Sequence, residues 1–193
     1  MLAHWPDGVT PLEETLAALE RCRQAGKIRW IGLSNHSAED VLRASDLVEI
    51  ASVQVRFNLL DRTQARPLID LAARRAISLV TWGSLAEGML TGKFSTNSTF
   101  ELGDRRNRYA NFRGTSFTEN LAIVRRVREV ATRLNKSSAQ VALRWLLDTP
   151  GVGSVLFGAK TPRQVQENLS ALGWTMSSQD YALVDSLTRQ RAA

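Results

Sequence analysis

Polar and aromatic side chains follow several short apolar segments of this sequence, at the points where the segments end. They are His4, Ser34, Asn35, Gln54 and Trp82. The carboxyl ends of parallel strands meet at one edge of a sheet, where α/β enzymes place their working residues. Imidazole, hydroxyl and amide groups can orient a polar ligand there, and an indole offers a flat face. The structural alternative is that Ser and Asn form turns and that the lone His belongs to the packing.

The segment after Trp82 is rich in small residues and ends in a lysine. Small side chains let the backbone approach a ligand closely and turn its amides toward an anion. The candidate lining residues are Ser84, Leu85, Gly88, Leu90 and Lys93. This segment is not a P-loop, because one residue too few separates Gly88 from Gly92 and Phe94 stands where Ser or Thr would bind Mg²⁺. A plain helix-capping turn beside a core tryptophan is the alternative.

A second candidate anion site follows the last apolar segment. Gly158 and Lys160 lead into a predicted helix that begins with Thr161 and Pro162, so Lys160 and Arg163 lie at its N-terminus. A cation there is unfavourable to the helix dipole unless an anion lies between them, so the arrangement predicts a bound phosphate. The same helix carries three further polar candidates, Gln164, Glu167 and Asn168.

Helix-start signals and apolar runs alternate along the chain. A Ser or Thr followed three residues later by an acid or amide predicts helix starts at Thr10, Ser37, Ser137, Thr161 and Ser177. The predicted helices include residues 41–48, 64–75, 119–134 and 138–147. The predicted strands are residues 28–32, 51–55, 77–82 and 154–157, with a stub before His4. Hairpin signals between strands are nearly absent, so we expect a parallel sheet.

The spacing of the early strands, about 25 residues, suits the serial βα units of an eight-fold barrel. A complete (β/α)8 barrel takes about 250 residues. We therefore predict an α/β fold that is a partial (β/α)8 TIM barrel, roughly the last four to five βα units, with residues 1–193 as a single domain and residues 95–117 as a long polar loop. An open half barrel leaves two bare strand edges, so either a missing segment or a second chain is expected to cover them.

Composition narrows the class of protein. The chain has 193 residues, of which 44% are hydrophobic and 23% charged, and no apolar run approaches 18 residues. These values predict a soluble globular protein with no membrane partner. The first twenty residues contain no Lys or Arg, and Cys22 is the single cysteine, so we expect no signal peptide, no internal disulfide and a cytoplasmic location.

The net charge is +6, but the arginine-rich stretch around residues 104–113 lacks the interleaved aromatic pairs of a single-strand binding groove. We therefore expect no nucleic-acid partner.

Five motifs together resemble the aldo-keto reductase family, in its bacterial, potassium-channel-β-like branch. They are residues 3–7 (AHWPD), 26–35 (GKIRWIGLSN), 53–54 (VQ) with Asn58, 88–93 (GMLTGK), and 158–160 (GAK) with Gln164, Glu167 and Asn168. The resemblance covers essentially all 193 residues in order, and it implies the C-terminal portion of such a protein, without its first strands.

The resemblance implies a barrel that binds NADP(H) without a Rossmann domain and reduces aldehydes or ketones. Ser34, Asn35 and Gln54 would then hold the nicotinamide carboxamide, and Trp82 would stack on the ring. The pyrophosphate would be lined by Ser84, Leu85, Gly88, Leu90 and Lys93. Lys160, following Gly158, would pair with the 2′-phosphate, and the adenine end would be surrounded by Gln164, Glu167 and Asn168. His4 would be the active-site histidine that orients the carbonyl.

The sequence departs from the family pattern in its proton donor. The family uses a Tyr tuned by a Lys and an Asp on strands that precede this chain, and neither Tyr109 nor Tyr181 matches that position. The resemblance therefore implies an NADP(H)-dependent oxidoreductase that acts on a small carbonyl substrate when complete and is weakly active or inactive alone. The alternatives are a non-catalytic NADP(H)-binding module, a half barrel that forms a homodimer, and a chain completed by a missing N-terminal half.

Overall fold

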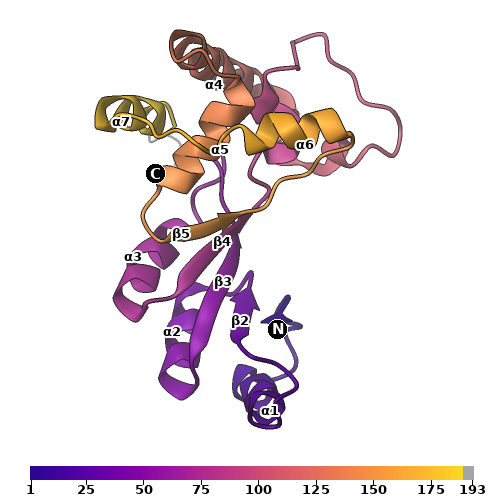
Figure 1. Ribbon diagram of the computed structural model, residues 1–193. Helices are drawn as coiled ribbons and strands as arrows, with labels where there is room; N and C mark the ends of the chain where they lie inside the picture. The colour runs from indigo at the N-terminus through magenta and orange to yellow at the C-terminus, as the bar shows by residue number, and fades with distance from the viewer. Residues whose placement is uncertain (189–193) are drawn as a thin grey trace.

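The described residues, 1–188 of the 193 in this computed structural model, form a parallel sheet of five strands (Figure 1). The strands are β1 (Leu2–Ala3), β2 (Ile31–Ser34), β3 (Ile50–Arg56), β4 (Ser78–Trp82) and β5 (Val152–Val155). Their order in the sheet is their order in the sequence, and every neighbouring pair is parallel. The predicted α/β class and parallel sheet are confirmed.

Helices connect the strands and cover one side of the sheet (Figure 1). The connecting helices are α1 (Leu12–Gln24), α2 (Ala38–Leu47), α3 (Arg66–Arg75), α4 (Gly114–Arg133) and α5 (Ser138–Asp148). Two more follow β5, namely α6 (Pro162–Leu169) and α7 (Ser178–Ser186). Their apolar faces pack with one side of the strands into a single cluster of buried residues, so the strand ends are held on a rigid base.

The two faces of the sheet differ in chemistry. Leu33, Val53 and Leu79 lie side by side in the register and are buried in the core. The alternate residues, for example Ser52 and Gln54 on β3, are only half-buried and belong to the face without helices. Because successive residues of a strand point to opposite faces, this alternation separates an apolar side from a small, polar side.

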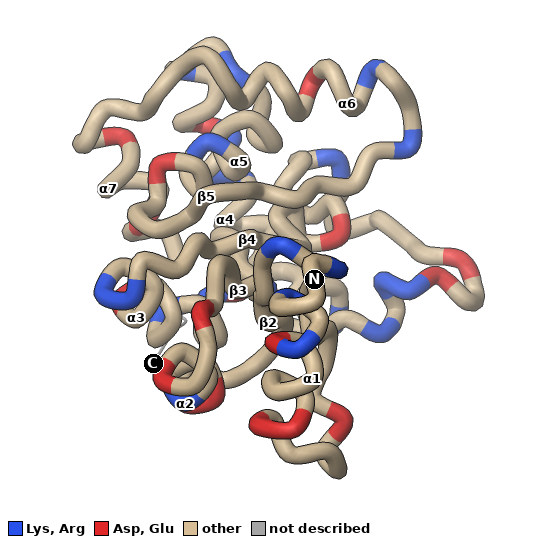
Figure 2. The backbone as a smooth tube through the Cα atoms, turned by 60° about the horizontal axis from the view of Figure 1, so that its bottom comes forward, with Lys and Arg blue, Asp and Glu red and all other residues tan. Residues whose placement is uncertain are grey.

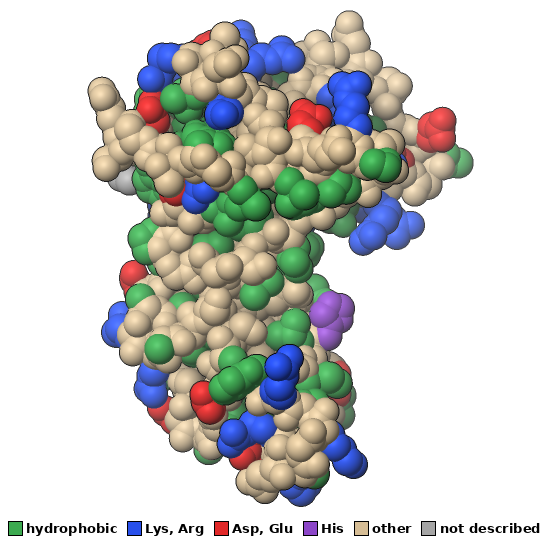
Figure 3. Space-filling view, viewed as in Figure 1, with side chains coloured by type: hydrophobic (Ala, Val, Ile, Leu, Met, Phe, Trp, Pro, Cys, Tyr) green, Lys and Arg blue, Asp and Glu red, His purple; other side chains and the backbone are tan. Residues whose placement is uncertain are grey.

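The outer strands of the described sheet, β1 and β5, each have one neighbour. Exposed apolar side chains lie near these edges: Leu2, Leu156, Leu169 and Leu172. Figure 3 shows apolar side chains gathered along β5 and the adjacent side of α6. The two edges therefore retain backbone groups and apolar surface that a further strand could cover.

Most predicted helix starts are confirmed. The side chains of Ser37, Ser137, Thr161 and Ser177 each accept a hydrogen bond from the backbone N–H three residues on. The prediction for Thr10 is wrong, because its hydroxyl donates to Asp7 at 2.6 Å and α1 begins without a side-chain cap.

Two predicted strands lie at slightly different positions in the structure. Residues 28–30 precede β2, because the neighbouring strand β3 begins at Ile50, opposite Ile31. The last strand runs over Val152–Val155 instead of 154–157, because its partner on β4 starts its pairing at Leu79, opposite Val152. Both shifts have the same cause: a strand extends only where a neighbour is present to receive its hydrogen bonds.

Residues 95–117, predicted as a polar loop, pack around aromatic rings. Four phenylalanines lie with ring centroids 5.2 to 6.4 Å apart: Phe94, Phe100, Phe112 and Phe117. Short 3₁₀ helices lie at Arg105–Arg108 and Ala110–Phe112. The predicted loop ends too late, because α4 begins at Gly114 and not at residue 119. Figure 2 shows the basic positions of this segment on the same side of the molecule as those that precede α6. Within residues 1–188, no helix combines the length and apolar character needed to cross a bilayer.

Candidate functional site

The polar residues predicted at the strand ends form one hydrogen-bonded chain. Trp82 Nε1 donates to Asn35 Oδ1 at 2.9 Å, and Asn35 Nδ2 donates to Ser34 Oγ at 2.9 Å. Ser34 Oγ in turn donates to Gln54 Oε1 at 2.9 Å. His4 joins through its backbone carbonyl, which accepts from Asn35 Nδ2 at 3.2 Å. The structure thus brings together the five residues predicted at the strand ends.

Asn35 can span this chain because of its backbone conformation. Its φ of 62° is left-handed, which Asn adopts more readily than most residues, and its N–H donates to the Gln54 carbonyl at 2.9 Å. The turn after β2 therefore directs the Asn35 amide back toward Ser34 and Trp82. The Trp82 ring is therefore held at its nitrogen, and its faces take no part in this hydrogen bond.

Two residues that the sequence analysis missed lie against the Trp82 ring. Trp5, whose exposed fraction is 56%, meets it edge-on at 6.5 Å, and the His4 ring packs against Trp5 at 6.2 Å. The Arg56 guanidinium lies over the Trp82 ring at 5.2 Å. Arg56 ends β3, two residues after Gln54 and on the same face, so the alternation of a strand was a signal that could have found it.

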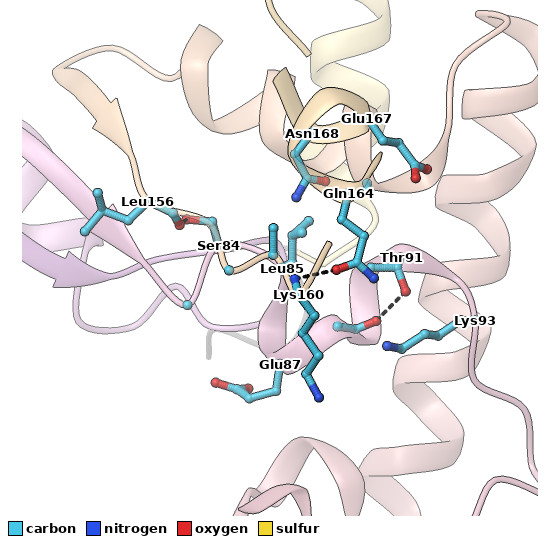
Figure 4. Close-up of a pocket in the computed structure, with 15 residues that line it drawn as sticks. Ser84, Leu85, Glu87, Thr91, Lys93, Leu156, Lys160, Gln164, Glu167 and Asn168 are labelled. Carbon is cyan, nitrogen blue, oxygen red and sulfur yellow. Dashed lines mark hydrogen bonds between the residues drawn. The ribbon is translucent and has the colours of Figure 1, made fainter. Parts of the chain in front are cut away.

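A cleft of about 590 Å³ lies where β4 ends, and its lining begins at Gly83, the residue after Trp82. Figure 4 shows the side chains that line it. The predicted residues that line it are Ser84, Leu85, Gly88, Lys93, Gly158, Lys160, Gln164, Glu167 and Asn168. Gly83, Glu87, Thr91, Ala139, Leu156 and Ala159 line it as well. The prediction for Leu90 is wrong, because its side chain is fully buried in the core and does not line the cleft. The two anion segments predicted from sequence therefore face each other across one cavity.

Hydrogen bonds from a side chain and to a side chain hold the walls of the cleft in place. The buried Ser84 Oγ donates to the Leu156 carbonyl at 2.7 Å, which joins the end of β4 to the end of β5. The N–H of Lys160 donates to Gln164 Oε1 at 2.7 Å, and Thr161 caps α6. The last turn before α6 is therefore fixed relative to the helix, and it presents the Lys160 side chain to the cleft (Figure 4).

Positive charge gathers at one end of the cleft. Figure 4 shows the Lys93 and Lys160 side chains reaching into the same part of the cavity. Burial and the neighbouring charges of Arg106 and Lys160 hold the pKa of Lys93 below its ordinary value. The fold has placed like charges close together, which is an arrangement that a phosphate would relieve.

Another part of the cleft wall, next to Lys93, is a left-handed turn. Ala86, Glu87 and Gly88 have φ values of 47°, 53° and 93° in succession. Glu87 accepts two hydrogen bonds from Arg56, each at 2.8 Å. Burial opposes the charge of Arg56, but Glu87 and Asp61 outweigh it and raise the pKa of the guanidinium. This ion pair connects the turn to the strand end below Trp82.

The groups present fit a nicotinamide dinucleotide in kind. A flat indole with amide and hydroxyl groups at one end suits a ring that carries a carboxamide, and two lysines beside a glycine-containing turn suit phosphates. Within residues 1–188, no group of three or more His, Cys, Asp and Glu side chains is arranged to hold a metal ion.

Neither tyrosine is joined to the chain of strand-end residues by a hydrogen bond in the described structure. The Tyr181 hydroxyl lies 3.0 Å from Thr149 Oγ1, its ring stacks on Trp145, and burial raises its pKa. Tyr109 lies over the Arg56 guanidinium at 5.5 Å.

Of the arginines in residues 104–113, Arg105, Arg106 and Arg113 have local partners. Arg106 pairs with Asp104 and lies over the rings of Phe94 and Phe100, and Arg113 donates to the Asn107 carbonyl. Hydrogen bonds from Arg106 hold the pKa of Asp104 at about 2. Part of the positive charge of this segment is therefore paired with groups inside the fold.

These features define an α/β protein with a candidate binding cleft at the carboxyl edge of a parallel sheet. The sequence model of the Aldo/keto reductase family matches residues 1–189, and the chain belongs to that family. The resemblance drawn from the motifs is confirmed.

Three comparisons show how much of such proteins the chain represents. Aldo-keto reductase YhdN of Bacillus subtilis is 36% identical over 185 residues, which are 95% of this chain and 56% of that protein. Aldo-keto reductase yakc [NADP(+)] of Schizosaccharomyces pombe is 33% identical over 88% of this chain and 51% of its own length. The structure of a glycerol dehydrogenase from Gluconobacter oxydans superposes with a TM-score of 0.90 at 31% identity, covering 98% of this chain and 57% of that one. The chain thus spans about half the length of the relatives it matches.

Proposed function

We propose that this chain is the cofactor-binding part of an NADP(H)-dependent oxidoreductase that interconverts a carbonyl and an alcohol. The observation that carries the proposal is the cleft that holds both Lys93 and Lys160 and whose lining begins at Gly83, the residue directly after Trp82. In this proposal the sheet is a partial (β/α)8 barrel, and strands preceding β1 complete it along the open edges. The relative yakc carries NADP(+) in its name, which supports the choice of cofactor.

The strand-end residues would hold the nicotinamide. When bound, the dinucleotide supplies or accepts the hydride. Ser34, Asn35 and Gln54 already share hydrogen bonds, so their free donors and acceptors are fixed in direction before a carboxamide arrives. Trp82, anchored by Asn35, would support the ring, and His4 would orient the carbonyl.

The phosphate end of the cleft would supply most of the binding selectivity. Lys93 lies beside the turn at Gly88, where a Cβ would come within 3.5 Å of the Lys93 amine. Lys160 at the start of α6 would pair with the 2′-phosphate, and Gln164, Glu167 and Asn168 would surround the adenine end. A 2′-phosphate carries two negative charges that NADH lacks, so Lys160 would favour NADPH.

Turnover needs a proton donor as well as a cofactor. Tyr181 is engaged with Thr149 and Trp145, and Tyr109 with Arg56. We therefore propose that the proton donor comes from outside these 193 residues, and that the chain alone reduces carbonyls weakly or not at all. The substrate of the complete protein would be a small carbonyl compound, and the protein would act in the cytoplasm. Neither a membrane nor a nucleic acid would be its partner.

Fluorescence titration of the 193-residue chain with NADPH and NADH tests the proposal. We expect saturable binding that prefers NADPH, and a loss of about tenfold in NADPH affinity in Lys160→Ala, typical of removing one charge-assisted contact. Lys27→Ala is the matched control, because Lys27 is an exposed lysine in the turn before β2. No binding by a chain whose circular dichroism shows it folded would refute the proposal.

The open edges favour a second candidate, a non-catalytic NADP(H)-binding module that closes by forming a homodimer. The apolar residues along β5 and α6 would then be buried between two copies. Light scattering at micromolar concentration distinguishes the two candidates. A dimer that binds NADPH supports the module, and a folded monomer that binds NADPH supports a barrel completed by further strands.

A further inference from the structure

Arg56 contacts several segments of the chain around the candidate site. Its guanidinium makes the two 2.8 Å bonds to Glu87, a 2.9 Å ion pair to Asp61, and ring contacts to Trp82 at 5.2 Å and Tyr109 at 5.5 Å. Its side chain keeps only 16% of its surface exposed. A planar guanidinium with several fixed donors is suited to hold groups from different segments at once.

The first of these segments is the left-handed turn in the wall of the cleft. Ala86 and Glu87 adopt φ values that residues other than glycine seldom take. Such a conformation persists only where contacts around it hold it. The Glu87 side chain pairs with Arg56, so this ion pair holds the turn together with the backbone hydrogen bonds that Ala86 and Gly88 donate within it.

The second segment is residues 105–113. Asn111 Nδ2 donates to both oxygens of Asp61, at 3.0 and 3.1 Å, and Asp61 pairs with Arg56. The Tyr109 ring contacts the same guanidinium, with its centroid 5.5 Å from Arg56 Cζ. Segment 105–113 is therefore attached to the site through Arg56 and Asp61, although it lies far from β3 in the sequence.

Glycine at position 83 leaves room for this arrangement. A Cβ there would come within 2.9 Å of an Arg56 terminal nitrogen, and φ is +65°. The guanidinium therefore passes directly against the backbone between Trp82 and the cleft. One cation thus contacts the Trp82 ring, Glu87 in the cleft wall and Tyr109 in segment 105–113.

We infer that Arg56 is a positioning residue that couples segment 105–113 to Trp82 and to the turn at Glu87, so that this segment and the turn in the cleft wall become ordered together. The consequence for NADPH affinity rests on the proposed function. The coupling itself does not, because it concerns contacts inside the chain.

Hydrogen exchange of the 193-residue chain tests the coupling without any cofactor. In Arg56→Met we expect the amides of residues 84–92 and of 105–113 to exchange about tenfold faster, together, while those of α1 and α2 keep their native rates. Asp46→Asn is the matched control, because it removes an ion pair of similar length, 2.8 Å to Arg75, away from the site.

Two variants separate the ion pair from simple loss of stability. Glu87→Gly removes the carboxylate and relieves the left-handed backbone, so the chain should stay folded while residues 105–113 lose protection and NADPH binds about tenfold more weakly. Arg56→Lys keeps the charge but lacks the planar fork, so it should resemble Arg56→Met.

The outcomes are distinguishable. Unchanged exchange in 105–113 after Arg56→Met or Glu87→Gly overturns the coupling, whatever the native chain binds. Faster exchange in both segments supports the coupling even where native protein fails to bind NADPH, a result that would instead refute the proposed function. A fall in melting temperature with unchanged NADPH affinity would reduce Arg56 to a structural residue and overturn its positioning role.

Discussion

Replacing Ser84 with alanine should loosen the junction between β4 and β5, the strands that flank the cleft. The Ser84 hydroxyl is buried, donates to the Leu156 carbonyl at 2.7 Å and lies 3.2 Å from the fully buried Thr81 hydroxyl. Leaving buried polar groups without their partner costs about 1–3 kcal/mol. We expect a loss near 2 kcal/mol, which for a chain of this size lowers the melting temperature by about 4–8 °C.

Thermal unfolding followed by circular dichroism measures this loss, and the chain offers a matched control. Ser186 also donates to a backbone carbonyl, Leu183, at 2.7 Å, but it lies exposed on α7. Ser186→Ala should therefore change stability by less than about 0.5 kcal/mol. If Ser84→Ala melts at the same temperature as Ser186→Ala, the hydroxyl does not hold the two strands together and the reasoning about the cleft walls is wrong.

Three further predictions concern the glycine beside Trp82 and the charges of the cleft. Gly83→Ala should lower the free energy of unfolding by about 2 kcal/mol in urea titration, because it adds a clash with Arg56 to the left-handed strain, whereas Gly103→Ala, with open space around it, should lose only about 1 kcal/mol. Asp104 has a folded pKa of about 2, below its ordinary 3.8, so it adds stability above pH 3.8 that disappears as the pH falls toward 2, and Asp104→Asn should flatten this part of a pH-dependent unfolding curve. Burial and nearby cations lower the pKa of Lys93, so the native chain should gain stability as the pH rises toward 10.5. Lys93→Met should lack that gain, and it should stabilise the free chain at neutral pH but weaken NADPH binding. Thermal melts with and without NADPH measure both effects.

Local signals in the sequence were the reliable part of the fold prediction. Ser37 and Ser137 cap helices by bonding to a backbone N–H three residues away, so the motif contains both partners. Thr10 failed because Asp7, three residues before it, competes for the same hydroxyl. Strand ends depend on a neighbour that lies about twenty residues or more away, as for Ile31 opposite Ile50, and no local pattern contains that information.

The candidate site was predictable where strand alignment determines it. Parallel strands bring their carboxyl ends to one edge, so Asn35 and Trp82 meet although 47 residues separate them. Arg56 was not predicted, because a charged residue at a strand end is usually a solvated side chain. Its pairing with Glu87 also depends on a left-handed turn at Glu87, a position where the sequence has no glycine to indicate one. The phenylalanine cluster escaped because its members follow no helical or strand period in a segment that is mostly polar.

The small residues on the uncovered face of the sheet give a physical reason to favour a barrel. A Cβ at Gly32 would come within 2.5 Å of Leu2 Cδ2 and 2.7 Å of Ser52 Oγ, and one at Gly153 would come within 2.1 Å of Ser78 Oγ. Neighbouring strands therefore crowd their side chains on this face, while the opposite face carries large apolar residues such as Leu33 and Leu79. Glycines at such crowded points let a sheet curve, which supports the proposal that further strands close it and complete the site around Trp82.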